Sequence, residues 1–143
     1  MPLVTVSSIR PALFATVPSR DYLLFWQSGR FQPQRVVRFL DLTNDDVARI
    51  AEVAPASVRF DRKAPRDLLE RLTEVAAICT LVAEFFAGDA TKCALWFRTP
   101  NPLLGEISPR DMIRLGENRK LRSLVMDAIT AQSRAAVDSN SRA

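Results

Sequence analysis

The chain has 143 residues, of which 48% are hydrophobic and 25% are charged, and its formal net charge is +4. This length and composition are typical of one globular domain with its own hydrophobic core. The chain contains no histidine, which excludes a Ser-His-Asp triad, a Cys-His dyad and any metal site that uses an imidazole ligand.

Residues 1–32 are predicted to form an N-terminal arm with one short helix. Residues 1–18 contain scattered apolar residues interrupted by prolines, so they lack the continuous apolar stretch of a signal peptide, and we expect a cytoplasmic protein. Ser19 can cap a helix over residues 21–28 that stops at Gly29. This helix is too apolar to stand alone in water, so it docks either on the core of its own chain or on a second copy.

The excess positive charge lies in the same part of the chain. Up to residue 40 there are five arginines and one acidic residue, whereas the remainder carries 15 basic and 15 acidic residues. A basic arm suits an anionic partner such as DNA or an acidic protein surface, although such an excess also occurs on ordinary solvated faces.

Residues 33–64 are predicted to form a module of three short helices that resembles a helix-turn-helix. Pro33 suits the first position of the first helix, Thr43 can cap the second, and Pro55 begins the third, which covers residues 55–61. Glu52 occupies the position in the turn that glycine often holds.

Two functions remain open for this module. If it binds DNA, the third helix lies in the major groove and presents Ser57 and Arg59, with Asp61 opposing the phosphates. The alternative is a three-helix core module that does not bind DNA.

Residues 65–88 are predicted to form the longest helix and the centre of the core. Apolar residues recur along it at spacings of three and four, as in a helix that buries one face. These residues are Leu68, Leu69, Leu72, Val75, Ala76, Cys79, Val82, Phe85 and Phe86. The most apolar part, residues 75–86, is too short to span a bilayer. Cys79 and Cys93 show no CxxC spacing, so we expect buried free thiols.

Residues 94–116 are predicted to form a shaped loop between two helices. Pro100 and Pro102 are incompatible with a continuing helix, because each fixes φ and lacks a backbone donor. Ser108 can cap the next helix, with Pro109 at its first position. Loops with large apolar side chains either cap a core or present a binding surface.

The last predicted helix covers residues 117–132 and is amphipathic. Its inward residues are expected to be Leu121, Leu124, Val125, Ala128 and Ile129. Residues 133–143 are small and polar, so we expect a mobile tail unless a partner orders it.

The proline-rich loop carries a specific resemblance. In order, the chain has Trp96, Pro100, Asn101, Leu104, Gly105, Pro109, Asp111, Met112 and Gly116, followed by an amphipathic helix. This pattern resembles the toxin-binding domain of the Xre/MbcA/ParS family of bacterial antitoxins, and the resemblance covers roughly residues 34–130. Met112 replaces the usual leucine, and Glu106-Ile107 forms a spacer in which the family often has a glycine or a basic residue.

The resemblance implies an interaction protein that supplies no chemistry of its own. The partner would be a RES-domain toxin, an enzyme that consumes NAD either by degrading it or by transferring ADP-ribose to a protein. The chain would block the NAD site sterically. Members of the family commonly dimerise, so we expect a homodimer within the toxin–antitoxin complex.

The predicted toxin-binding residues lie in two places. In the loop and its flanks they are Trp96, Phe97, Arg98, Pro100, Asn101, Leu103, Leu104, Gly105, Pro109 and Met112. In the closing helix and the tail they are Ile129, Arg134 and Asp138. Asn101 is expected to bond to the loop backbone and hold a turn, whereas Trp96 either packs within the chain or contacts the toxin.

Together these observations predict an all-α, compact bundle of about seven helices. We expect an N-terminal arm (residues 1–32), a helix-turn-helix-like module (residues 33–64) and a toxin-binding domain with a polar tail (residues 65–143). The second hypothesis is a DNA-binding transcriptional regulator. An enzyme is disfavoured, because the sequence shows no paired carboxylates, phosphate-binding glycine loop or cluster of metal ligands, and neither a cofactor nor a metal is expected.

Overall fold

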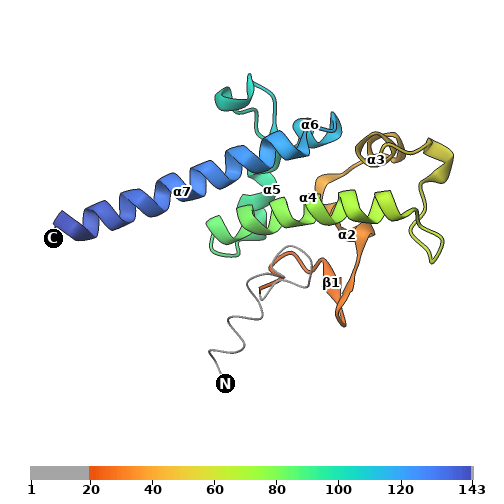
Figure 1. Cartoon of the computed structure of the whole chain (residues 1–143), viewed down its shortest axis with the longest axis horizontal. Helices are drawn as coiled ribbons and strands as arrows, with labels where there is room; N and C mark the ends of the chain where they lie inside the picture. The colour runs from red at the N-terminus through yellow and green to blue at the C-terminus, as the bar shows by residue number, and fades with distance from the viewer. Residues whose placement is uncertain (1–19, 143) are drawn as a thin grey trace.

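The computed structural model describes residues 20–142, the last seven as backbone only, and shows a mostly helical chain (Figure 1). In chain order its elements are β1 (Trp26–Gln27), β2 (Arg30–Phe31), α2 (Pro33–Leu40), α3 (Asn44–Ala51), the 3₁₀ turn η2 (Pro55–Ser57), α4 (Arg66–Phe85), α5 (Ala90–Arg98), the 3₁₀ turn η3 (Pro102–Leu104), α6 (Pro109–Arg114) and α7 (Asn118–Arg142). The predicted helical class is confirmed.

The helix predicted over residues 21–28 is wrong, because this segment forms a β-hairpin. Strands β1 and β2 pair antiparallel, with Trp26 opposite Phe31. Ser28 and Gly29 both have positive φ, as a two-residue hairpin turn requires. The carboxylate of Asp21 accepts hydrogen bonds from the backbone N–H groups of Phe25 and Trp26, each at 2.9 Å. Ser19, the predicted cap, lies outside the described residues.

The hairpin packs on the core of its own chain. The side chain of Phe25 is fully buried, and its ring meets the ring of Phe39 edge to face, with centroids 5.9 Å apart. Tyr22, Leu23 and Trp26 are partly buried against the same core. This segment was expected to dock either on its own core or on a second copy, and the structure places it on its own core.

Helices α2 and α3 form as predicted. Thr43 caps α3 with a capping box, in which its hydroxyl accepts from the N–H of Asp46 and the Asp46 carboxylate accepts from the N–H of Thr43. Glu52 ends α3 with φ of 57°, the left-handed conformation that glycine adopts most easily.

The third helix of the predicted module is wrong in extent, since only Pro55–Ser57 are helical and form one 3₁₀ turn. Residues 58–60 have no regular secondary structure. The Asp61 carboxylate pairs with Arg59 and also accepts the backbone N–H of Lys63. These local bonds compete with helical ones, so the described residues lack the helix that the DNA-binding alternative places in the major groove.

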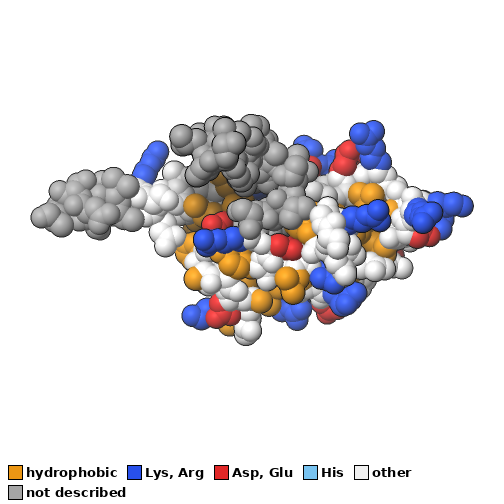
Figure 2. All heavy atoms as spheres, turned by 90° about the horizontal axis from the view of Figure 1, so that it is seen from below, with side chains coloured by type: hydrophobic (Ala, Val, Ile, Leu, Met, Phe, Trp, Pro, Cys, Tyr) orange, Lys and Arg blue, Asp and Glu red, His pale blue; other side chains and the backbone are white. Residues whose placement is uncertain are grey.

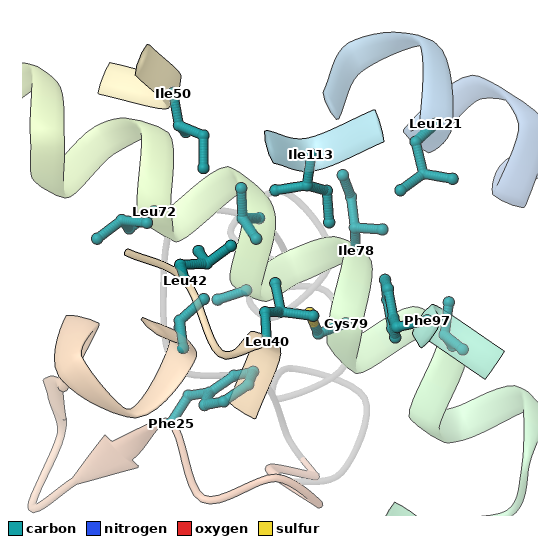
Figure 3. Packing of buried hydrophobic residues seen from close by; sticks show 14 of the residues in the cluster. Phe25, Leu40, Leu42, Ile50, Leu72, Ile78, Cys79, Phe97, Ile113 and Leu121 are labelled. Atoms are coloured by element: carbon teal, nitrogen blue, oxygen red, sulfur yellow. The ribbon is translucent and has the colours of Figure 1, made fainter. Parts of the chain in front are cut away.

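Helix α4 lies at the centre of the core, and α2, α3, α5 and α7 all pack against it (Figures 1 and 3). Most residues of the predicted apolar stripe are buried, including Leu68, Leu72 and Val75. The stripe is narrower than predicted, because Leu69 and Phe85 are 36% and 49% exposed. Figure 3 shows Leu72, Ile78 and Cys79 of α4 pointing toward residues of the surrounding helices.

Two helices with side-chain caps follow α4, and the predicted cap at Ser108 is confirmed. Asp89 caps α5 by accepting from the N–H of Lys92 at 3.1 Å, and Ser108 caps α6 by accepting from the N–H of Asp111 at 3.1 Å. Met112 and Ile113 of α6 are buried, whereas Leu115, which follows the helix, is 61% exposed.

Helix α7 is longer than predicted. The first half of α7 packs against the core through the buried side chains of Leu121 and Val125, whereas residues 130–135 are exposed. Ala128, which was expected to face inward, is exposed as well. Residues 133–142, which were expected to form a mobile tail unless a partner orders them, lie in the same helix, which continues to Arg142 and extends beyond the rest of the molecule (Figure 1).

Candidate functional site

The proline-rich loop between α5 and α6 is a tight turn organised by Asn101. Its side-chain oxygen accepts from the N–H of Leu103 at 2.9 Å, and its carbonyl accepts from the N–H groups of Leu104 and Glu106. The N–H of Asn101 donates to the carbonyl of Ile107 at 3.0 Å and forms an isolated β-bridge. The expectation that Asn101 bonds to the loop backbone is confirmed, and the loop has a defined shape of its own.

The loop presents an apolar tip to solvent. Leu103 is 78% exposed, the highest value among the large hydrophobic side chains described. Pro100 and Gly105 are also exposed, whereas Leu104 is half-buried against the core. Figure 1 shows η3 standing away from the body of the molecule. The loop is therefore a rigid apolar projection.

Three of the predicted site residues lie in the core instead of on the surface. Phe97 and Pro109 are fully buried, and Met112 is 4% exposed. The Phe97 ring packs edge to face against Phe39, at 6.1 Å between centroids, and against Trp96, at 5.0 Å. Buried residues on both sides of the loop thus hold its two ends in place.

Trp96 and Ile129 come together at one apolar pocket. The pocket has a volume of about 80 Å³ and lies between α4, α5 and α7. Its other lining residues are Val82, Phe85, Phe86, Leu124, Val125 and Ala128. Both Trp96 and Ile129 are half-buried there, and Leu103 does not line the pocket.

The other predicted residues on α7 lie further along the helix. Arg134 is exposed. Asp138 belongs to the backbone-only part of α7, and its side chain lies outside the described residues. A second, larger groove of about 830 Å³ runs between α4 and α7 and includes Leu69 and Met126 among its lining residues.

Figure 2 shows one face of the molecule, on which hydrophobic side chains alternate with charged ones. Lys and Arg side chains gather at the end opposite the C-terminus of α7. This is the end at which α3 and η2 lie in Figure 1. Arg59 and Ser57, the predicted DNA-binding residues, are exposed, and Arg59 is paired with Asp61.

An ion pair between a buried carboxylate on α3 and a partly exposed arginine links α6 to α3. The carboxylate of Asp46, 3% exposed, accepts from Nε of Arg114 at 3.2 Å and from Arg49 at 3.3 Å. Burial alone would raise the pKa of this carboxyl. Hydrogen bonds from the Thr43 backbone and the Arg114 guanidinium outweigh burial and hold the pKa of Asp46 below its ordinary value. Arg49 also donates to the carbonyl of Arg114 at the end of α6.

Sequence reasoning missed one exposed apolar residue beside the loop. Leu95 on α5 is 66% exposed. The inward residues of the same helix are Cys93 and Phe97. They lie two residues before and two residues after Leu95, which places Leu95 on the opposite face of the helix. Helical spacing within α5 could therefore have identified it.

The two cysteines are free and buried, as predicted. Burial raises the pKa of the Cys93 thiol to about 12, and burial together with the neighbouring Cys93 raises the pKa of Cys79 well above its usual value. Both thiols are therefore protonated at neutral pH and poor nucleophiles.

Within residues 20–142, the described side chains form no group of three or more His, Cys, Asp or Glu suited to a metal ion. No helix in that part is long and apolar enough to cross a membrane.

Comparison with known proteins identifies the family. The mycobacterial cidal antitoxin MbcA of Mycobacterium tuberculosis is 31% identical over 90 residues, which cover 60% of this chain and 78% of the relative. The MbcA protein of Mycobacterium bovis matches equally well. The chain belongs to the MbcA family of antitoxins.

A solved structure also resembles this MbcA-family chain. The crystal structure of the M. tuberculosis MbcT–MbcA toxin–antitoxin complex contains a chain that aligns with a TM-score of 0.41 at 24% identity. The alignment covers 65% of this chain and 86% of that one. No model of a known protein family matches the sequence.

Proposed function

We propose that this chain is the antitoxin of a type II toxin–antitoxin pair and that it binds a RES-domain toxin so as to block the toxin's NAD-binding active site. The observation that carries this proposal is the rigid loop whose exposed tip is Leu103. Membership of the MbcA family supports the antitoxin role, and the motif resemblance supports the RES-domain partner.

The loop is suited to tight binding because it is already ordered. Its turn is held by four hydrogen bonds that involve Asn101, so little conformational entropy is lost when a partner covers it. An apolar side chain at the centre of such a surface is the kind of group that contributes most to affinity. We assign direct contact to Leu103, Pro100 and the exposed edge of Leu104.

The buried members of the predicted site have a different role in this proposal. Phe97, Pro109 and Met112 hold the loop on the core, and Asn101 shapes its turn. Leu95, which is exposed on α5, extends the apolar contact. Trp96 contributes to the apolar contact with the toxin through its exposed part, at the edge of the pocket that it lines with Ile129.

The outer part of α7 is assigned to the toxin's active-site cleft. Residues 130–135 are exposed on a helix that projects from the body, so they can enter a concave site while the loop binds beside it. Arg134 and Asp138 supply charge of both signs on this segment. Steric exclusion of NAD needs no catalytic group, and the chain acts without a cofactor of its own.

We further propose that the antitoxin acts in the cytoplasm as a homodimer within the complex. The exposed Leu24 beside the hairpin is available to such a contact. Light scattering during gel filtration measures the mass of the purified toxin–antitoxin complex, and a complex that contains one antitoxin chain would contradict the dimer.

The decisive experiment for function uses the cognate RES-domain toxin that this proposal expects to be encoded beside the antitoxin. The purified toxin is assayed for NAD consumption with increasing amounts of the full-length antitoxin. We expect stoichiometric inhibition that extra NAD relieves only before the complex has formed. A toxin that consumes NAD at the same rate in the presence of excess antitoxin would refute the proposed function.

A further inference from the structure

The C-terminus of α2 is contacted by both ends of the proline-rich loop. Arg98, the last residue of α5, donates from Nη2 to the carbonyl of Phe39 at 3.3 Å. Arg110, the second residue of α6, donates from Nε to the carbonyl of Leu40 and from Nη2 to the carbonyl of Asp41. Two arginines that flank the loop therefore bind three successive carbonyls.

These carbonyls need partners from outside the helix. The last carbonyls of a helix have no intrahelical donor and carry the negative end of the helix dipole. In α2 the chain reversal at Asp41 provides donors to Val37 and Arg38, through the N–H groups of Leu42 and Asp41. The guanidinium groups of Arg98 and Arg110 donate to the next three carbonyls. Both ends of the loop are therefore attached to the C-terminus of α2, at acceptors that lack a partner within the helix.

We infer that Arg110, assisted by Arg98, is a positioning residue for toxin binding: it fixes the orientation of the loop on the body without touching the toxin. This inference rests on the proposed function. The hydrogen bonds of Asn101 are internal to the loop, so the loop keeps its shape when Arg110 is replaced. What changes is the fraction of molecules in which the loop points in the binding direction.

Loss of position has a kinetic signature that loss of contact does not share. When only a fraction of the molecules is competent to bind, the apparent affinity falls by that fraction. The association rate falls with it, whereas the dissociation rate of the complex stays the same. Removal of a direct contact mainly raises the dissociation rate.

The choice of arginine is part of the argument. A planar guanidinium can donate to two neighbouring carbonyls at once, whereas a lysine ammonium offers a single centre of charge. Arg110→Lys keeps the charge and removes this geometry. It therefore separates positioning from long-range electrostatic attraction, which high salt also suppresses.

The test measures association and dissociation rates of the full-length antitoxin with the RES-domain toxin by surface plasmon resonance, at low and high salt. For Arg110→Gln and Arg110→Lys we expect association about three- to tenfold slower and dissociation changed less than about twofold. Arg38→Gln, an equal loss of charge at an exposed residue of α2, is the matched control and should bind like wild type. Thermal unfolding verifies that each variant folds, and Arg98→Gln replaces Arg110→Gln if the latter does not.

Two results would overturn the inference while leaving the proposed function intact. Unchanged association by both Arg110 variants would show that the loop does not depend on this anchor. Faster dissociation with normal association would show that Arg110 contacts the toxin directly. If wild-type antitoxin itself fails to bind the toxin, the proposed function falls and the inference falls with it.

Discussion

Leu103 combines an exposed side chain with a backbone that is fixed by a hydrogen bond. Its side chain is 78% exposed, while its backbone N–H is bonded to the side chain of Asn101. Large apolar groups presented on a fixed backbone are typical of interaction sites. The contribution to binding that we propose for Leu103 can therefore be tested separately from its contribution to folding.

We expect Leu103→Asp to weaken binding to the toxin by about tenfold or more, because a charge would be desolvated at the contact. The thermal unfolding midpoint should stay close to that of wild type, since the side chain makes few contacts in the free protein. Calorimetric titration measures the affinity. Leu115→Asp is the control, because Leu115 is 61% exposed and no contact with a partner is assigned to it. An equal loss of affinity in both variants would contradict a specific role for Leu103.

Two neighbouring residues at the end of α4 should respond to substitution with opposite signs. Ala87 has φ of 56°, a left-handed conformation that is unfavourable for alanine, so Ala87→Gly should stabilise the fold by about 0.5–1 kcal/mol. A Cβ on Gly88 would lie 2.6 Å from Cδ1 of Tyr22, and φ there is +85°. Gly88→Ala should therefore destabilise the fold by about 1–3 kcal/mol. Urea unfolding measures both, and a shared sign would refute this account.

At the scale of elements, the helices with side-chain caps could be predicted from the sequence. Thr43, Asp89 and Ser108 each accept a backbone N–H three residues along the chain, and such bonds are local. The hairpin could not be predicted in this way. Its aromatic residues suit a strand or a buried helix, and the choice depends on the Asp21 carboxylate and the turn at Ser28.

The length of α7, like the hairpin, could not be predicted from the local sequence pattern. Small polar residues after position 132 suggested a mobile tail, but alanine has a high helix propensity and the helix is already nucleated in the core. Its anchors, Leu121 and Val125, lie in the first turns. The two halves of α7 should therefore respond differently to mutation.

Removal of residues 131–143 should leave the fold intact and weaken neutralisation of the toxin. The anchors in the first half of α7 stay in place, so the thermal unfolding midpoint should change little. Survival of cells that express the toxin measures neutralisation. A shorter deletion, of residues 140–143, serves as the control. Full protection by the protein that lacks residues 131–143 would show that the outer helix does not reach the toxin's cleft.

At the scale of the whole molecule, the buried carboxylate of Asp46 connects α3 with α6 through Arg114. Because its pKa is lowered in the folded state, the ionised form stabilises the fold above the unfolded pKa of about 3.9. This contribution is lost as the pH falls through that value toward the folded pKa. The attachment of the loop segment to α3 therefore weakens in acid.

We expect Asp46→Asn to reduce the free energy of unfolding by about 1–3 kcal/mol at pH 7, because hydrogen bonds to a charged group are replaced by weaker ones. The difference from wild type should shrink below about pH 4, where Asp46 becomes protonated in the unfolded chain. Urea unfolding between pH 3 and pH 7 measures it. Asp45→Asn, at an exposed position in the same helical turn, is the control. A difference that does not vary with pH would exclude an ionised Asp46 as the cause.

The presence of a shaped loop in this part of the chain could be predicted from the sequence, but which of its residues face solvent could not. Prolines and Asn101 mark a shaped loop because their constraints are local. Whether Phe97, Met112 or Leu103 faces solvent depends on what α2 and α4 place beside the loop. The arginine contacts to α2 likewise join residues 59 to 70 positions apart, which no local pattern reveals.

The projection of α7 also bears on how long the free protein survives. A helical segment without a core partner opens more easily than the rest of a fold, and Arg134 lies in such a segment. A protease could remove the outer helix there while the core stays folded. The lifetime of the intact inhibitor would then depend on whether a partner shields α7. Limited trypsin digestion should cleave after Arg134 before it cleaves the core, and more slowly when the toxin is bound.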